Sequence, residues 1–518
     1  MPVKLMEFIV FFRKIRWWVL VFSTVLILGA CTRNTTEDNA PWKANQGFVP
    51  PTSAADSNAN PYITNPRLTN QPILTPTPDT PHPIPGARTD TEQYVVQTGD
   101  TLGQIANRYG VSMDDIAEAS ELTDINILSV GQLLVIPPPD PVTTGPGFKI
   151  IPDSELIASP VTIYFDTADF AYQQNGYLIR HEEEIDGKML SGVQIVQLVA
   201  QDNSVNPRLL LAVLEYQSGW VTNPNPRSET LKYPLGWKAP NREGLYHQLS
   251  WAANELSRGY YTWRVNGVGT WVLNDGVVVP IDPTINAGTA ALQYFFAKLY
   301  DAKFWERTVS EEGFFAVYST LFGYPFDYTF DPILPAGLTQ PKLQLPFEMG
   351  KEWSFTGGPH GGWGDGSAWA ALDFAPPGDS VGCVSSDEWV VAVADGPIVR
   401  AENGAVVQDL DGDGHEQTGW SILYMHIESR ERVQPGAQLK AGDRIGHPSC
   451  EGGVSNGTHV HLARRYNGEW IPADQNIPFN LDGWVSSGSG NMYDGYLSKN
   501  GITVEAWDRR TPESLIQR

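Results

Sequence analysis

Gly457-Thr458-His459-Val460-His461-Leu462 places two histidines one residue apart near the end of a chain of 518 residues. Alternate side chains of a β-strand share a face, so both imidazoles are expected to face one groove while Val460 faces the core. Such a pair can supply metal ligands or acid–base groups to one bound atom. Surface tracts and core pairs also contain this pattern, so its meaning depends on the rest of the chain.

The length and charge of the chain limit the classes of function. A chain of this length exceeds what one core can organise, so about three domains are expected. The formal net charge is −24, and no basic stripe follows residue 20. Nucleic acid is therefore not expected as a partner, because binding it relies on clustered Lys and Arg.

Residues 1–30 have the features of an export signal. Basic residues precede a mainly apolar run from Trp17 to Ala30, which is short for a membrane span and typical of a signal peptide. The run ends at Leu28-Gly29-Ala30-Cys31, which resembles the bacterial lipoprotein lipobox and implies a lipid anchor on Cys31. An uncleaved N-terminal anchor is the alternative. Both place the body of the protein outside the cytoplasm, at the cell envelope.

Residues 31–92 are rich in Pro, Thr and Asn and too poor in apolar residues to bury a core, so we expect a tether. The remaining cysteines, Cys383 and Cys450, belong to a compartment that permits disulfides. We predict that they form one, and metal ligation by thiolates is the alternative.

Residues 93–138 predict a small βααβ unit. Apolar positions at helical spacing follow a turn, a second helix fits 113–120, and a strand fits 132–136. The opening Tyr-x-Val-x-x-Gly-Asp-Thr-Leu from Tyr94 and the ending Gly-Gln-Leu-Leu-x-Ile-Pro from Gly131 resemble a LysM domain. The resemblance implies binding of N-acetylglucosamine-containing glycans, here peptidoglycan. The implied glycan-binding residues are Gly99, Asp100, Thr101, Leu102, Ile125, Asn126, Ile127 and Leu128.

A linker at 139–149 leads to residues 150–334, where the periodicity predicts helices at 191–201, 207–216 and 286–299. The stretch from Val205 to Trp220 resembles the active-site helix of lytic transglycosylases with a lysozyme-like fold. Gln217 stands where that family has a catalytic Glu, and an amide cannot protonate a glycosidic oxygen. We therefore expect a glycan-holding domain without lytic activity. An unrelated helical spacer and an active glycosidase remain open. Four tryptophans are assigned to the core by default: Trp237, Trp251, Trp263 and Trp271.

Residues 345–518 contain short apolar runs separated by Gly and Asp turns, which predicts an all-β domain. This last third of the chain holds six of its nine histidines. They are His360, His415, His426, His447, His459 and His461.

Four blocks in this domain resemble the lysostaphin-type zinc endopeptidases that cut peptidoglycan cross-bridges. They are Thr356–Trp363, Ala371–Pro376, Leu423–Ile427 and the opening stretch. The thirteen-residue gap between the first His and the Asp is longer than in most members and resembles the β-lytic, staphylolysin-like branch. The resemblance implies antiparallel sheets of the duplicated hybrid motif type. It also implies zinc bound by His360, Asp373 and His461, with His426 and His459 as the catalytic pair.

Two features fit no position of that family. His415 and His447 are predicted to be surface residues. Asp409-Leu410-Asp411-Gly412-Asp413-Gly414 resembles the opening of a calcium loop, but Trp420 stands where the bidentate Glu would be, which favours a polar hairpin tip.

The sequence thus predicts a cell-wall hydrolase: a tethered lipoprotein with a LysM module and a zinc endopeptidase that acts on peptidoglycan peptides. Tethering would raise the local concentration of substrate. A non-catalytic regulator of another wall hydrolase and a structural wall-anchoring protein are the alternatives.

Overall fold

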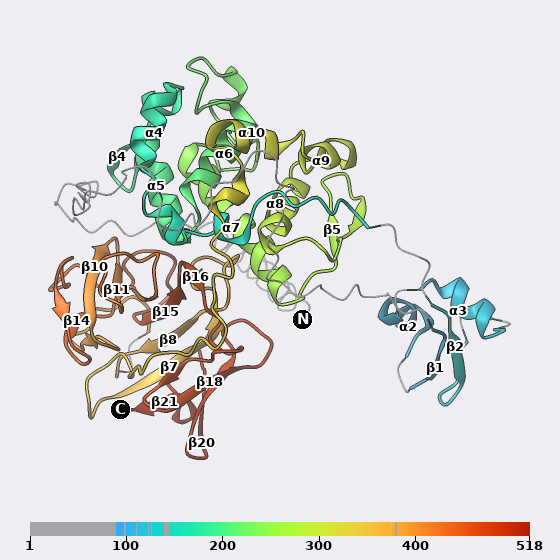
Figure 1. Cartoon of the computed structure of the whole chain (residues 1–518). Coiled ribbons are helices and arrows are strands. Elements are labelled where there is room, and N and C mark those ends of the chain that lie inside the picture. Colours follow the sequence, from blue (N-terminus) through green and yellow to red (C-terminus); the bar gives the residue numbers. More distant parts are fainter. Residues whose placement is uncertain are drawn as a thin grey trace, which may run out of the picture.

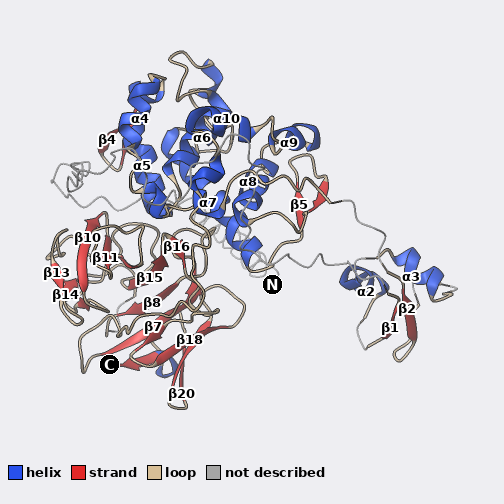
Figure 2. Cartoon of the chain, viewed as in Figure 1, coloured by secondary structure: helices blue, strands red, loops and turns tan. Residues whose placement is uncertain are grey.

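The computed structural model describes residues 90–97, 100–109, 111–122, 124–125, 127–138, 144–378 and 381–518. The predicted signal, Cys31 and most of the tether lie outside the described residues, as do Gly99 and Asn126. Figures 1 and 2 show three groups of elements: a small α/β unit, a helical domain and a β-rich domain.

The small unit consists of two helices on a two-stranded antiparallel sheet. Its elements are β1 (Glu92–Val95), α2 (Leu102–Tyr109), α3 (Met113–Ala119) and β2 (Leu133–Ile136). Helix α3 begins at a reciprocal cap, in which Ser112 and Asp115 each accept a hydrogen bond from the other's backbone N–H. Apolar side chains at helical spacing close the core, with Leu102, Ile105 and Ile116 buried.

The middle domain is mainly helical, as the periodicity predicts. Helix α6 begins where Asn206 caps it and Pro207 occupies its first turn, and it ends at Gly219, which adopts a left-handed conformation. The helices are α4 (Thr167–Gln174), α5 (Gly192–Asn203), α6 (Pro207–Ser218), α7 (Leu245–Arg264), α8 (Ala287–Ala297), α9 (Ala302–Thr308) and α10 (Phe314–Phe322). Two hairpins accompany them: β3 (Glu182–Ile185) with β4 (Lys188–Ser191), and β5 (Thr270–Val272) with β6 (Val278–Pro280).

The C-terminal domain is built on a nine-stranded antiparallel sheet, in the order β13-β10-β11-β12-β15-β8-β7-β21, with β16 paired to β15. Its strands are β7 (Glu352–His360), β8 (Ala371–Ala375), β10 (Gly396–Glu402), β11 (Ala405–Asp409), β12 (Trp420–Met425), β13 (Gln438–Leu439), β15 (Val460–Tyr466), β16 (Glu469–Trp470) and β21 (Leu515–Gln517). Two smaller sheets flank it: β9 (Val390–Val391) with β14 (Arg444–Gly446), and β17 (Asn480–Leu481), β18 (Trp484–Gly488), β19 (Gly495–Lys499) and β20 (Ile502–Glu505).

The central strands bury both faces. On one face, Val460, Leu462 and Phe374 join the core of the C-terminal domain. On the other face, Leu423 and Ala463, which are cross-strand partners, pack into the core of the middle domain. The middle domain therefore covers part of this sheet, and the two domains share an apolar core (Figure 1).

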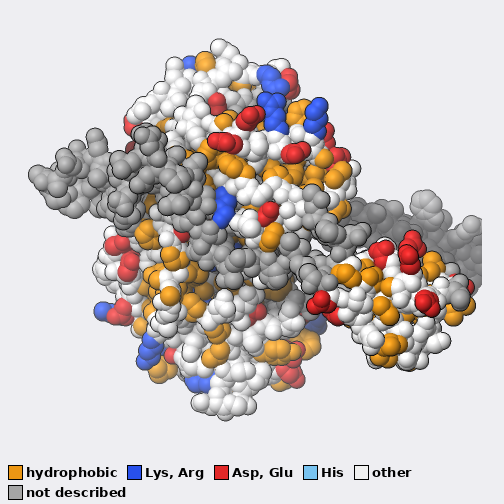
Figure 3. Space-filling view, turned by 45° about the vertical axis from the view of Figure 1, so that its right-hand side comes forward, with side chains coloured by type: hydrophobic (Ala, Val, Ile, Leu, Met, Phe, Trp, Pro, Cys, Tyr) orange, Lys and Arg blue, Asp and Glu red, His pale blue; other side chains and the backbone are white. Residues whose placement is uncertain are grey.

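None of the helices among the described residues is long and apolar enough to cross a membrane. On the face drawn in Figure 3, Lys and Arg side chains stand in small separate groups.

Candidate metal and catalytic site

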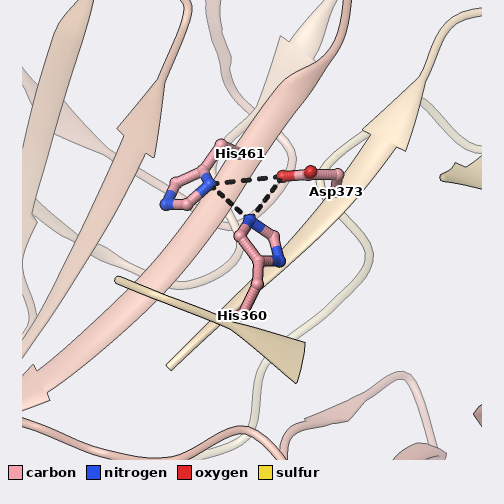
Figure 4. A group of neighbouring side chains, drawn as sticks. All are labelled: His360, Asp373 and His461. Carbon is pink, nitrogen blue, oxygen red and sulfur yellow. Dashed lines mark hydrogen bonds and ion pairs between the residues drawn. The ribbon is translucent and has the colours of Figure 1, made fainter. Parts of the chain in front are cut away.

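Three strands bring the predicted metal ligands together. His360 ends β7, Asp373 lies on β8 and His461 lies on β15, directly across from Asp373 in the strand register. His360 Nε2 lies 2.9 Å from His461 Nδ1 and 3.3 Å from Asp373 Oδ1, and His461 Nδ1 lies 3.2 Å from the same oxygen. Figure 4 shows the three groups pointing at one another.

The second nitrogen of each ring is bound to a backbone carbonyl. His360 Nδ1 donates to Gly358 O over 2.8 Å, and His461 Nε2 donates to Gly362 O over 3.1 Å. In the neutral rings the nitrogens that face each other therefore carry lone pairs rather than hydrogens. Asp373 Oδ1 is buried and, among the described residues, accepts no hydrogen bond. Two imidazole nitrogens and one carboxylate oxygen thus converge in a buried region, an arrangement that favours a bound cation.

The electrostatics of His360 support this conclusion. Burial alone would lower the pKa of His360, but the carboxylate of Asp373 raises it above its ordinary value. The carboxylate therefore favours positive charge at His360, whereas burial lowers the pKa of His461. Tetrahedral zinc with ligands at ~2.0–2.2 Å separates its ligand atoms by roughly 3.3 Å, so the donor set and its spacing fit zinc.

The predicted catalytic pair lies beside this cluster. The rings of His426 and His459 are 4.6 Å apart, and His459 Nε2 lies 3.6 Å from Asp373 Oδ1. His426 Nδ1 and His459 Nδ1 lie 3.0 and 2.7 Å from the carbonyl oxygens of Glu451 and Gly457. Burial, together with the neighbouring histidines, lowers the pKa of His426 to about 3. Its imidazole is consequently neutral at pH 7.

The backbone of His426 is unusual, because its φ of 66° lies in the left-handed region just after β12 ends at Met425. Ser449 donates to the His426 carbonyl from its backbone N–H over 2.7 Å and from its hydroxyl over 2.9 Å. These bonds hold the strained residue in place beside the metal cluster.

The predicted disulfide between Cys383 and Cys450 is present and joins two loops beside His459. Thr458 N–H donates to Gly382 O over 3.1 Å, and His459 N–H donates to Ser449 O over 3.3 Å. The bridge therefore braces the backbone on both sides of the histidine.

Tyr493 also lies at the cluster, although no sequence motif indicated it. Its ring stacks on His360 with centroids 4.3 Å apart, and its backbone N–H donates to Pro359 O over 3.1 Å. Its φ of 70° belongs to a turn between β18 and β19. Burial, and then the nearby Asp373, raise the pKa of Tyr493, so its phenol remains protonated.

The prediction that His447 lies on the surface is wrong. It is 2% exposed, its ring packs on Trp389 with centroids 4.0 Å apart, and its two nitrogens contact Glu388 O and a carboxylate oxygen of Glu431. His415 is half-buried.

The predicted hairpin tip after β11 brings three carboxylates together in a second cluster. Asp409, Asp411 and Asp413 offer oxygens within 4.8 Å of one another. The carboxylate of Asp409 accepts backbone N–H bonds from Asp411, Gly412 and Gly414. The hydrogen bonds within the loop are therefore enough to explain why the carboxylate of Asp409 is buried.

In the middle domain, Gln217 Oε1 accepts a hydrogen bond from the hydroxyl of Tyr300 over 2.9 Å. Both oxygens of Glu215 are bound by the loop after α6, through Val221 N–H, Thr222 N–H and the Thr222 hydroxyl. Glu215 therefore stabilises this loop.

Three protein families match the chain. Residues 94–137 match the LysM domain, residues 149–334 match the N-terminal domain of LasA, and residues 380–473 match Peptidase family M23. The segment that matches Peptidase family M23 thus follows the segments that match the LysM domain and the N-terminal domain of LasA. The M23 match includes His426, His459 and His461, whereas His360 and Asp373 precede it and join the site through the fold.

Two curated relatives are both named Protease LasA, from two strains of Pseudomonas aeruginosa. Each is 26% identical over 285 residues, which is 52% of this chain and 64% of the relative. The chain therefore matches a little under two thirds of the length of these proteins.

Solved structures similar to the chain include the M23 metalloprotease pseudoalterin and the catalytic domain of lysostaphin from Staphylococcus simulans. Pseudoalterin is 26% identical, with a TM-score of 0.28, and the match covers 34% of this chain and 99% of that one. The lysostaphin domain is 25% identical, with a TM-score of 0.18, and the match covers 24% of this chain and 89% of that one.

Proposed function

We propose that the C-terminal domain is a zinc endopeptidase that cleaves the peptide cross-bridges of peptidoglycan. The observation that carries this proposal is the convergence of His360 Nε2, His461 Nδ1 and Asp373 Oδ1 with their electron pairs directed inward. Peptidase family M23, whose pattern residues 380–473 match, is zinc-dependent.

The chain divides the chemistry between two sets of side chains. His360, Asp373 and His461 would hold zinc, which supplies Lewis-acid polarisation of a carbonyl and activation of water when bound. The imidazole of His426 or His459 accepts the proton that is released when water attacks the peptide carbonyl. The same imidazole, once protonated, donates to the leaving amine.

The other parts of the chain would deliver the peptidase to its substrate. The LysM domain binds glycan strands through Asp100, Thr101 and the residues around Ile127, and a lipid on Cys31 anchors the tether at the membrane. Holding the enzyme against the wall raises the effective substrate concentration, so the peptidase groove can itself bind weakly. In this proposal the middle domain is a lysozyme-like scaffold whose Gln217 cannot act as an acid.

Digestion of purified peptidoglycan with the zinc-loaded chain, followed by mass analysis of the fragments, tests this function. We expect new amine termini from cleaved cross-bridges, and their loss in His461→Ala. The matched control is His415→Ala, which removes a histidine of the same domain outside the cluster. Intact cross-bridges with unchanged glycan binding would favour a non-catalytic regulator. Anhydro-sugar ends would instead assign lytic activity to the middle domain.

A further inference from the structure

The segment Gly361–Ser367 lies between the metal cluster and the middle domain. It belongs to the long gap between His360 and Asp373. The carbonyl of Gly362 accepts the hydrogen bond from His461 Nε2 over 3.1 Å, so the position of this segment bears directly on the imidazole ring. Within the segment, Trp363 N–H donates to the Ser367 hydroxyl over 3.0 Å, which keeps the turn compact.

Helix α7 of the middle domain holds the outer end of this segment. Asn254 uses both ends of its amide: Nδ2 donates to Asp365 Oδ1, and Oδ1 accepts from Gly366 N–H, each over 2.9 Å. Arg258, four residues later and on the same face of the helix, contacts Asp365 Oδ1 at 2.7 Å. Two side chains from one domain therefore engage two consecutive residues of the other.

The glycines of the segment are required by this close approach. A Cβ on Gly366 would lie 2.0 Å from the carbonyl oxygen of Asn254, and a Cβ on Gly362 would lie 2.6 Å from the ring of Trp470. Gly364 has a φ of +66°, and a Cβ there would lie 2.8 Å from Asn254 Oδ1. The glycines of the gap thus allow its backbone to lie directly against α7 and β16, where a side chain would not fit.

We propose that the middle domain is a positioning element for the metal site, with Asn254 and Arg258 clamping Gly361–Ser367 so that Gly362 O orients the His461 imidazole. The contact chain runs from α7 through Asp365 and Gly366 to Gly362, and from there to the ligand. Groups that hold the far nitrogen of a ligating histidine fix its tautomer and direction, and losing such a partner typically weakens metal binding about 10–100-fold. This inference rests on the zinc site of the proposed function.

The α7 helix is a rigid support for this role, because it is itself attached to the C-terminal domain elsewhere. Tyr260 and Arg264 reach the carboxylate of Glu469 on β16, at 3.3 and 3.1 Å. The backbone N–H of Trp470 donates to the hydroxyl of Tyr261 over 2.9 Å. These contacts fix the helix relative to the sheet independently of the contacts made by Asn254 and Arg258.

The test measures zinc affinity by chelator competition, together with hydrogen exchange of the 361–367 amides, in the full chain. The variants are Asn254→Ala, Asp365→Ala and the double variant. All are expected to fold, because both side chains are partly exposed. The control is Asp395→Ala, which removes a comparable exposed carboxylate, paired with Lys440. Unfolding temperatures are compared in parallel.

We expect the double variant to bind zinc about tenfold more weakly and to exchange the Gly366 N–H faster, with the control unchanged. Zinc affinity within about twofold of that of the unsubstituted chain would overturn the inference. The readout separates the two proposals. A chain that binds zinc through His461 but cleaves no peptidoglycan refutes the function alone, whereas unaltered zinc affinity in the clamp variants refutes the clamp alone.

Discussion

His360 and His461 each have one ring nitrogen fixed by a backbone carbonyl, that of Gly358 for His360 and that of Gly362 for His461. The backbone thus selects the tautomer that turns a lone pair towards Asp373. Metal binding at this cluster would therefore require no rearrangement of the rings, only the displacement of any proton held there.

The division of roles among the histidines predicts two kinds of defect. His426→Ala and His459→Ala should retain zinc and lose about 10²–10⁴-fold of the peptidase rate, because each removes a proton acceptor and leaves the metal ligands in place. His461→Ala should lose zinc itself. Metal content by mass spectrometry and initial rates of peptide cleavage measure the two effects separately. Zinc loss in His426→Ala would contradict the assignment.

The directions in which side chains point were predictable where a strand alternates regularly. Val460 is fully buried in the domain core while His461 faces the cluster, as the His-x-His pattern predicts. Tyr493 and Gly362 O could not be predicted, because a turn conformation and a backbone carbonyl leave no residue-type signature. The surface assignment of His447 failed because its burial depends on Trp389, a contact that no local pattern encodes.

One face of β8, β12 and β15 contributes both to the metal cluster and to the contact with the middle domain. Asp373 and His461 lie in the metal cluster, while two residues further along Ala371 and Ala463 pack against the middle domain. Periodicity alone does not say what covers the second face of these strands. The helix at 207–216 was predictable, and it continues to Ser218 because Gly219 ends it.

The disulfide ties together two loops beside His459. Cys383 and Cys450 are separated by 67 positions, so their bridge should contribute about 4 kcal/mol to the free energy of unfolding through loss of chain entropy in the unfolded state. Chemical unfolding of the Cys383→Ser, Cys450→Ser double variant measures this difference. Reductant should destabilise the natural chain to the same level and leave the double variant unaffected. An unchanged unfolding midpoint on reduction would contradict this prediction.

At the scale of the whole molecule, the two large domains are joined by buried charges as well as by apolar contacts. Arg400 contacts Asp202 of α5 and Glu416 of its own domain, both at 3.1 Å, and Glu416 also pairs with Arg465. Burial alone would raise the pKa of Glu416, but the two arginines lower it to about 2. A carboxylate in this position is stable only while it remains charged.

This depressed pKa predicts how stability depends on pH. The folded pKa lies below the ordinary value near 4.5, so the stabilisation by Glu416 is present above that value and is lost as pH falls towards 2. Glu416→Gln should therefore cost about 3 kcal/mol at pH 7 and progressively less in acid. Denaturant unfolding at several pH values checks this. Parallel stability curves for the two proteins would contradict it.

The interdomain arrangement was the least predictable feature. The resemblance around Gln217 suggested a lysozyme-like domain, whereas the family match is to the LasA N-terminal domain. Neither indicated that α7 would reach the metal cluster through Gly361–Ser367. This contact joins residues about 110 positions apart, and a contact over such a distance leaves no local pattern in the sequence.

Anomalous diffraction at the zinc edge, from crystals of the zinc-loaded chain, shows directly whether His360, Asp373 and His461 bind zinc. We predict one strong peak within ~2.2 Å of His360 Nε2, His461 Nδ1 and Asp373 Oδ1. The same peak should be absent in crystals of His461→Ala. A peak at Asp409–Asp413 instead, or zinc bound equally well without His461, would contradict the assignment of His360, Asp373 and His461 as the zinc ligands.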